Sequence, residues 1–335
     1  MWTSYWYHFE FSSQRDTARD GWPSGYVVLA PSMYNTVSML ERLITEQDNP
    51  ESRDLDGFSM PHLLGIMNAA DAQVASAVAR EIPRIAAAAE AIIAALESAG
   101  SLIYIGAGTS GRLGVLDAAE CPPTFGVPPE LVRGIIAGGE RALAHAVEGV
   151  EDNPLAGVHD LEASGFGSKD VLVGISASGR TPYVLGAVRK AREINALTCA
   201  ISCVQDSELS RLVQYPIEPI CGPEVLTGST RLRAGTATKL VLNMISTAVM
   251  VKLGHVYGNL MVNVQPTNRK LEDRARRIIQ AATGLAFDQA AELLDRAGRS
   301  VRVAIVMQKK KIARPEAEAL LATAKGRIRE ALESG

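Results

Sequence analysis

Two short turns rich in hydroxyl groups are the residues of this sequence best suited to chemistry. Residues 109–112 read Thr-Ser-Gly-Arg, and residues 177–180, 68 positions later, read Ala-Ser-Gly-Arg. Each turn follows a short apolar run, at 102–105 and at 171–175, and precedes a stretch that can form a helix. A strand, a hydroxyl-rich turn and a helix in this order present backbone N–H groups and hydroxyls to a phosphate. We therefore expect one anionic ligand to be held from two sides.

A third hydroxyl cluster occupies residues 227–231, Thr-Gly-Ser-Thr-Arg, just before a long apolar stretch. One interpretation is a helix N-cap, because Ser and Thr are preferred at that position. The other is that Ser229 and Thr230 contact the same ligand as the first two turns. The sequence leaves both interpretations open.

Residues 106–111 also match GxGxxG, the fingerprint of dinucleotide-binding sites, in a strand-to-helix context. That fingerprint predicts an acidic ribose-binding residue about 20 residues further on. The first acid after the second expected strand is Glu140, 29 residues past Gly111. Glu140 lies too far along the chain for the ribose-binding acid, and the Ser-Gly-Arg sequence is repeated in the second turn. Both observations favour a compact monophosphate over a dinucleotide as the ligand.

Short apolar runs alternate with helical patterns through the middle of the chain, which predicts an α/β fold with a doubly wound parallel sheet. An Ala-rich helical pattern at 61–96 precedes the sheet, and a long helix is expected at about 233–254. Strands are expected at 101–106, 132–137, 170–176, 197–203 and 215–220, with helices at 111–120, 140–151, 182–195 and 206–212.

The two ends of the chain differ from this middle part. The first 38 residues hold all 3 tryptophans, and we expect them to be a poorly ordered extension or an artefact upstream of a natural start. Residues 39–265 are then the phosphate-binding domain with its helical lead-in. Residues 266–335 are expected to form a small helical C-terminal domain, with helices at 270–282, 288–297 and 315–332.

Composition narrows the class of protein. The formal net charge of −3 argues against a general nucleic-acid binder, which needs a basic field. The 4 cysteines and 5 histidines have no metal-site spacing, so we expect no metal. The longest apolar candidate, residues 240–253, contains Asn243 and Lys252 and fits a buried helix better than a membrane span.

Five segments taken together resemble the N-acetylmuramic acid 6-phosphate etherases, a family within the sugar isomerase (SIS) domain superfamily. The resemblance extends over roughly residues 43–335, and its departures include Arg233 where the family usually has Lys and Ser176 where it usually has Ala. The segments are residues 106–114, 116–124 (with Glu-Cys-Pro-Pro-Thr), 177–184, 226–231 (with Gly-Ser-Thr-Arg) and 259–262.

The resemblance implies an SIS core and a cytoplasmic homodimer that uses no cofactor. It further implies a sugar-phosphate substrate, N-acetylmuramate 6-phosphate, whose D-lactyl ether is cleaved with water during cell-wall sugar recycling. Two rival functions remain. An SIS-domain regulator would sense a sugar phosphate without catalysis, and an aldose–ketose isomerase would release no lactate.

The resemblance also implies two catalytic acids. Glu120 is the acid or base for the C2 proton or the leaving oxygen, at the end of a helix that we expect Pro122 and Pro123 to stop. Glu151 is the second catalytic acid, and Glu148 is the residue most easily mistaken for it. Arg112 and Arg180 could pair with the phosphate or with a second subunit. The expected phosphate contacts are Thr109, Ser110, Ser178, Gly179 and Thr181.

Overall fold

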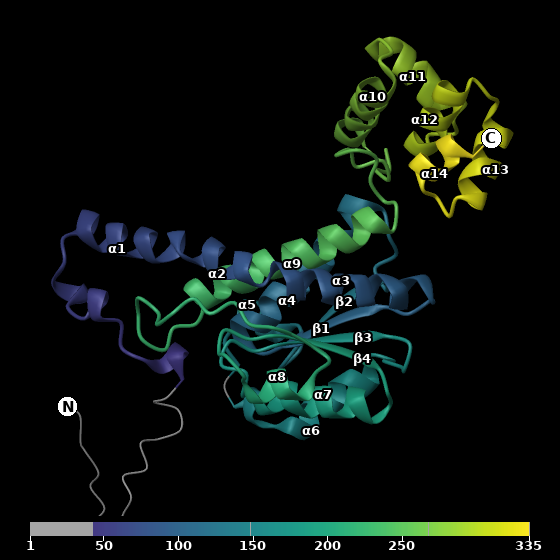
Figure 1. Ribbon diagram of the computed structural model, residues 1–335. Helices are drawn as coiled ribbons and strands as arrows, with labels where there is room; N and C mark the ends of the chain where they lie inside the picture. Colours follow the sequence, from purple (N-terminus) through teal and green to yellow (C-terminus); the bar gives the residue numbers. More distant parts are fainter. Residues whose placement is uncertain (1–42, 148, 267, 335) are drawn as a thin grey trace, which may run out of the picture. The chain divides into compact units, whose positions relative to one another are not determined.

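The computed structural model describes residues 43–147, 149–266 and 268–334. The extension predicted at 1–38 lies outside the described residues. At the centre is a five-stranded sheet in the order β2-β1-β3-β4-β5, in which all neighbouring strands are parallel. This order confirms the doubly wound α/β fold, because the chain winds away from β1 in both directions (Figure 1). The strands are β1 (Leu102–Gly106), β2 (Val132–Ile136), β3 (Val171–Ile175), β4 (Leu197–Ile201) and β5 (Tyr215–Ile217).

Helices cover both faces of the sheet, which explains why the strands are continuous apolar runs. Leu102 and Tyr104 of β1 join one core cluster, whereas Ile103 and Ile105 join the other. The first face is covered by α3 (Ile82–Glu97), α4 (Gly108–Phe125) and α9 (Arg233–Lys252), and the second by α6 (Pro154–Ala163), α7 (Pro182–Glu193) and α8 (Glu208–Leu212) (Figure 1).

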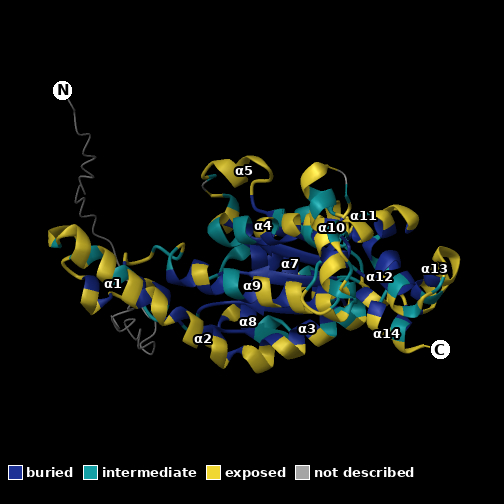
Figure 2. Cartoon of the chain, turned by 90° about the horizontal axis from the view of Figure 1, so that it is seen from above, coloured by how far each residue is buried: buried dark blue, intermediate teal, exposed yellow. Residues whose placement is uncertain are grey.

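The helical pattern predicted at 61–96 forms three consecutive helices and not one. It consists of α1 (Met60–Ala72), α2 (Val74–Arg80) and α3, with junctions at Gln73 and Glu81. Glu81 accepts a hydrogen bond from the backbone N–H of Glu218 at 2.8 Å, so tertiary contacts fix the second junction. Most residues of α1 are exposed, as Figure 2 shows.

Three further helix predictions need correction. The helix expected to stop at Pro122 continues as α4 to Phe125 and ends at Gly126, whose φ is +63°. The helix expected at 140–151 is only the one-turn α5 (Arg141–Ala144), because the chain becomes extended at His145, with φ −127° and ψ +151°. The sequence reading missed α6, although Asn153 caps it and Pro154 occupies its first turn, which are typical start signals.

The long helix α9 satisfies the length and composition of a membrane span. In the fold it lies across α2, α3 and α4, and 11 of its 20 residues are buried. The apolar composition of α9 is therefore that of a helix in the protein core, as the sequence predicted.

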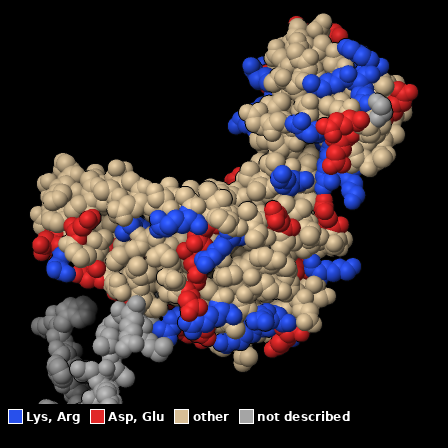
Figure 3. Space-filling model, viewed as in Figure 1, with Lys and Arg blue, Asp and Glu red and all other residues tan. Residues whose placement is uncertain are grey.

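On the face in Figure 3, basic and acidic side chains are interspersed over the sheet domain.

The C-terminal helices have a core of their own, formed by buried side chains such as Val262, Ile279 and Ile305. The expected helix at 315–332 is interrupted between Thr323 and Ile328, and one helix, α12, was missed. The elements are α10 (Arg269–Thr283), α11 (Phe287–Arg296), α12 (Val301–Lys310), α13 (Arg314–Thr323) and α14 (Ile328–Glu333).

Two glycines allow α6 and α7 to pack backbone against backbone. A Cβ on Gly186 would lie 2.2 Å from the carbonyl oxygen of Pro154, and a Cβ on Gly157 would lie 1.9 Å from that of Tyr183. This contact fixes the segment just before α6 relative to the turn just before α7.

We expect Gly186→Ala to lower the free energy of unfolding by about 1–3 kcal/mol, because the helices must separate to admit the methyl group. Urea unfolding measures the loss. Gly65→Ala is the matched control: no atom lies within 4 Å of its added Cβ, and Ala is the better helix former. Equal stability of the Gly186→Ala variant and the wild type would contradict the close packing.

Candidate functional site

A cavity of about 410 Å³ opens at the carboxyl ends of β1 and β3. The strand order reverses between these two strands, which is where doubly wound folds bind their ligands. Residues from both predicted turns, from the third hydroxyl cluster and from an acidic loop line it. They are Ala107, Gly108, Thr109, Ser110, Glu151, Asp152, Ser176, Ala177, Ser178, Arg180, Thr181, Pro182 and Thr230.

The first turn is the N-terminus of α4. The helix begins at Gly108, two residues after β1 ends, so Thr109 and Ser110 lie in its first turn. The chain is tight here, because a Cβ on Gly106 would lie 2.7 Å from the backbone nitrogen of Gly111. The first N–H groups of a helix have no intrahelical partners, and its N-terminus carries partial positive charge. Together with the two hydroxyls they form an anion-binding end of the cavity.

The second turn holds its hydroxyls in a small network. The hydroxyl oxygens of Ser176 and Thr181 lie 2.8 Å apart, and the backbone N–H of Arg180 donates to Ser178 Oγ at 3.3 Å. Gly179, with φ +66°, makes the sharp bend and is not among the residues that line the cavity. Thr181 precedes α7, so a second helix N-terminus is directed at the same cavity.

The third cluster contributes Thr230, whereas Ser229 is not among the lining residues. Glu224 fixes the start of the following helix α9, because its carboxylate accepts hydrogen bonds from the backbone N–H groups of Arg233 and Ala234, each at 2.9 Å. Burial raises the pKa of Glu224. The Arg233 guanidinium donates to Pro223 O and to Gln73 Oε1, so it joins the loop before α9 to the junction of α1 and α2.

The two arginines of the repeated motif differ in placement. Arg180 lines the cavity. Arg112 instead donates to the carbonyl oxygens of Leu143 and His145, at 3.2 and 3.0 Å, and ties down the loop after β2. The motif alone did not distinguish the two roles.

The two candidate acids lie in different places. Glu151 lines the cavity together with Asp152, in the one-turn segment Val150–Asp152 ahead of α6. Glu120 is exposed on α4, ten residues after Ser110, and is not among the lining residues. A helix rises 1.5 Å per residue, so about 15 Å of helix separates Ser110 from Glu120. Glu148, the residue that could be mistaken for Glu151, lies outside the described residues.

Sequence reasoning left Arg180 open and did not select Asp152 or Ser176 as site residues. Arg180 is the last residue of the predicted second turn and Ser176 directly precedes that turn, so their neighbourhood was the available signal. Asp152 was overlooked because it follows Glu151 in a charged stretch, where a solvated surface is the ordinary expectation.

A buried ionic network lies one helical turn before Glu120. Asp117 is 4% exposed, its Oδ1 lies 3.2 Å from Lys239 Nζ on α9, and its Oδ2 accepts from the Tyr104 hydroxyl at 3.2 Å. Burial, followed by the charge of Asp117, raises the pKa of Tyr104 well above its usual value. Burial also raises the pKa of the neighbouring Cys121 thiol to about 12, so this cysteine is no thiolate nucleophile at neutral pH. The network fixes α4 against α9.

Comparison with known proteins gives the following similarities. The family model of the N-terminal SIS domain of glucokinase regulatory protein matches residues 84–192. The N-acetylmuramic acid 6-phosphate etherase of Rubrobacter xylanophilus is 53% identical over 296 residues, which cover 88% of this chain and 98% of that protein. The protein of that name from Exiguobacterium sp. is 54% identical over 88% of this chain and 100% of its own length. A solved phosphoheptose isomerase from Neisseria gonorrhoeae is 16% identical with a TM-score of 0.45, covering 57% of this chain and 99% of that chain.

We expect Ser178→Ala to weaken the binding of inorganic phosphate by about tenfold, because one hydrogen bond to a charged group is lost. Isothermal titration calorimetry measures the affinity. Ser229→Ala is the control, since Ser229 lies outside the cavity lining. Equal affinities in the two variants would contradict the assignment of the second turn to an anion.

Proposed function

The chain belongs to the N-acetylmuramic acid 6-phosphate etherase family, and we propose that its hydroxyl-rich turns hold the substrate phosphate while two glutamates break the D-lactyl ether. The observation that carries the activity is 53% identity over 98% of a curated etherase. The protein is a carbon–oxygen lyase. It converts N-acetylmuramate 6-phosphate and water into N-acetylglucosamine 6-phosphate and D-lactate, a step of amino-sugar recycling.

The cavity accounts for recognition of the phosphate. Ser110 supplies a hydroxyl from the first turn of α4 and Ser178 one from the turn that precedes α7. Thr109 and Thr181 also line the cavity, and Arg180 supplies the positive charge. Gly179 contributes by permitting the turn. Hydroxyl and backbone donors that converge from two helices suit the three oxygens of a phosphate monoester.

The chemistry follows from the open-chain form of the sugar. The C1 aldehyde acidifies the proton on C2, and the lactyl oxygen on C3 is β to the carbanion that forms. A base removes the C2 proton, the C3–O bond breaks, and an acid protonates the departing lactate oxygen. Water then adds at C3 and a proton returns to C2, so atoms balance without an oxidant. Two positioned carboxylates, Glu120 and Glu151, suffice for these proton transfers.

The position of Glu120 leads us to propose that the site is completed by a second copy of the chain. Glu120 is exposed and lies about 15 Å along α4 from Ser110. In a homodimer, the exposed Glu120 of one subunit approaches the cavity of the other, where Glu151 already lies. We place this homodimer in the cytoplasm, as the family resemblance implies.

We expect Glu120→Gln and Glu151→Gln each to lower kcat for D-lactate release by about 10²–10⁴-fold, because a proton-transfer group is lost. Lactate is measured by a coupled enzyme assay. The control is Glu130→Gln, an exposed glutamate in the loop before β2, which should retain full activity. Near-normal turnover of either catalytic variant would remove that residue from the mechanism.

The same assay separates the rival functions. Tight binding of the sugar phosphate with no lactate from the wild type would favour a sensor. Conversion of glucosamine 6-phosphate to a ketose, again without lactate, would favour an isomerase.

We expect a mixed dimer of a Glu120→Gln chain and a Ser110→Ala chain to recover about half of the wild-type activity, because one of its two sites is then intact. Two affinity tags isolate the mixed dimer from co-expressed chains. Each variant alone is the control. A mixed dimer no more active than its parents would show that Glu120 and Ser110 serve the same cavity within one chain, and it would leave the etherase activity itself unaffected.

A further inference from the structure

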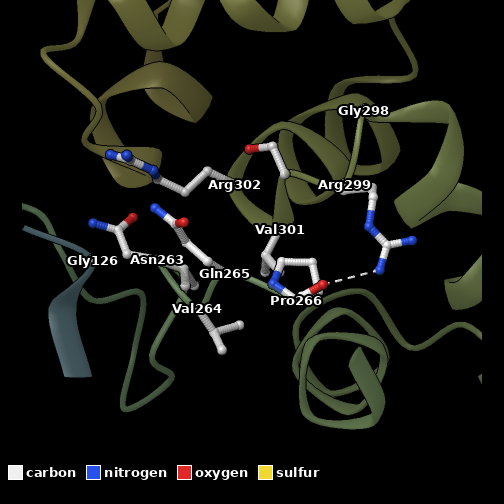
Figure 4. Close-up of a pocket in the computed structure, with 11 residues that line it drawn as sticks. Gly126, Asn263, Val264, Gln265, Pro266, Gly298, Arg299, Val301 and Arg302 are labelled. Carbon is white, nitrogen blue, oxygen red and sulfur yellow. Dashed lines mark hydrogen bonds between the residues drawn. The ribbon is translucent and has the colours of Figure 1, made fainter. Parts of the chain in front are cut away.

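A second cavity, of about 400 Å³, lies away from the three turns, between the end of α4 and the start of α12. Gly126, the residues from Val262 to Pro266 and those from Gly298 to Arg302 line it. Figure 4 shows the side chains of Asn263, Gln265 and Arg302 gathered at one side of the cavity. Neither the catalytic acids nor the phosphate turns belong to it.

Arg302 gives this cavity a positive charge without a counter-ion. Its Nη1 donates to the carbonyl oxygen of Gly326 at 3.3 Å, and no carboxylate forms an ion pair with it in the part of the chain that the structure describes. Burial lowers the pKa of the guanidinium, which remains charged at neutral pH. Arg299, on the rim, is already engaged with Glu272 at 3.0 Å. A half-buried cation in this state favours an anionic ligand.

Asn263 supplies a polar group that lacks its partner. The side chain is 9% exposed, and its amide nitrogen donates to Phe125 O at 2.7 Å and faces His255 Nδ1 at 2.6 Å. Because Phe125 O accepts, the amide orientation is fixed, and Oδ1 has no donor among the described residues. Burial, together with the charge of Arg302, lowers the pKa of His255 and so favours the neutral ring, whose Nδ1 can accept from the Asn263 amide. An unpaired buried oxygen calls for a donor such as a hydroxyl.

The first turn of α12 adds backbone donors. The Ser300 side chain caps this ten-residue helix by accepting from the N–H of Val303 at 3.4 Å. Val301 and Arg302, whose N–H groups precede the first helical hydrogen bonds, are among the residues that line the cavity. The positive end of the helix therefore reinforces the charge of Arg302.

We propose that this second cavity binds a phosphorylated sugar, with the phosphate at Arg302 and the α12 N-terminus and a sugar hydroxyl donating to the Asn263 side. The charge of Arg302 favours an anion, and the unpaired Oδ1 of Asn263 favours a hydrogen-bond donor. A sugar has several hydroxyl donors, whereas inorganic phosphate at neutral pH has few. The volume, about 400 Å³, is nearly that of the first cavity, about 410 Å³, to which we assign a sugar phosphate. The choice of ligand class, but not the charge argument, therefore rests on the proposed function.

The test is calorimetric titration of a Ser110→Ala/Ser178→Ala protein, in which the first cavity is impaired, with N-acetylglucosamine 6-phosphate. We expect this protein still to bind one equivalent, and a further Arg302→Met substitution to weaken that binding by about tenfold or more. Gln265→Ala, at the exposed edge of the cavity, provides a second variant that does not touch the core. It should weaken the sugar phosphate by about threefold or more. Arg296→Met, an exposed arginine at the end of α11, is the matched control.

Two results would overturn the proposal: no binding by the Ser110→Ala/Ser178→Ala protein, or the same affinity with and without Arg302→Met and Gln265→Ala. Titration with unphosphorylated N-acetylglucosamine should give no heat, and binding equal to that of the phosphate ester would also overturn it. Inorganic phosphate should bind more weakly than the sugar phosphate, and equal affinity would reduce the site to a simple anion site. Lactate release by the wild type is assayed separately, so failure of this site and failure of the etherase assignment give different results.

Discussion

The free N–H groups at the starts of α4 and α7 are the constraint on which the architecture of the site depends. Each helix follows a strand of the parallel sheet, and β1 and β3 are neighbours in that sheet. Two positive helix ends therefore meet at one point, at the reversal of strand order. A single multivalent anion can satisfy their unpaired donors together with the hydroxyls of Ser110 and Ser178 beside them, which is the arrangement that we propose for the substrate phosphate.

The rest of the domain keeps these two helix ends in register. On one face, the buried ion pair of Asp117 with Lys239 fixes α4 against α9. On the other face, Gly157 and Gly186 let α6 and α7 touch backbone to backbone. Glu151 precedes α6 and Thr181 precedes α7, so this contact also sets how the acid approaches the second turn. We therefore expect a change in the α6–α7 interface to alter the position of Glu151, the proposed catalytic acid.

Sequence reasoning succeeded where the signal is local and failed where tertiary contacts decide. The five strands and the two hydroxyl-rich turns were predicted because apolar runs and the glycine-hydroxyl pattern consist of consecutive residues. The ends of two strands were misplaced, since β4 ends at Ile201 and β5 at Ile217, before the predicted 203 and 220. The breaks at Gln73 and Glu81 were not predicted. Glu81 accepts a hydrogen bond from the backbone N–H of Glu218, 137 residues away, and a local pattern does not reveal such a contact. Proline usually ends a helix because it lacks a backbone N–H, yet α4 continues past Pro122 and Pro123. Cys121 and Phe125 pack in the core there, and this packing compensates for the missing helical hydrogen bonds. The family resemblance was confirmed, whereas the different surroundings of Arg112 and Arg180 could be assigned only from the fold.

Recognition of the phosphate and the choice of reaction are carried by different parts of this chain. The turns at Ser110 and Ser178 offer donors to a phosphate monoester and contain nothing that distinguishes one sugar reaction from another. Discrimination must come from acids delivered by other elements, and the acids that we propose lie in a short segment before α6 and in the second half of α4. A sheet that anchors phosphate can thus serve a sensor, an isomerase or an etherase, according to which carboxylates reach C2 and C3. Since Glu120 is presented outward rather than into the cavity of its own chain, the proposed homodimer makes assembly part of the catalytic chemistry.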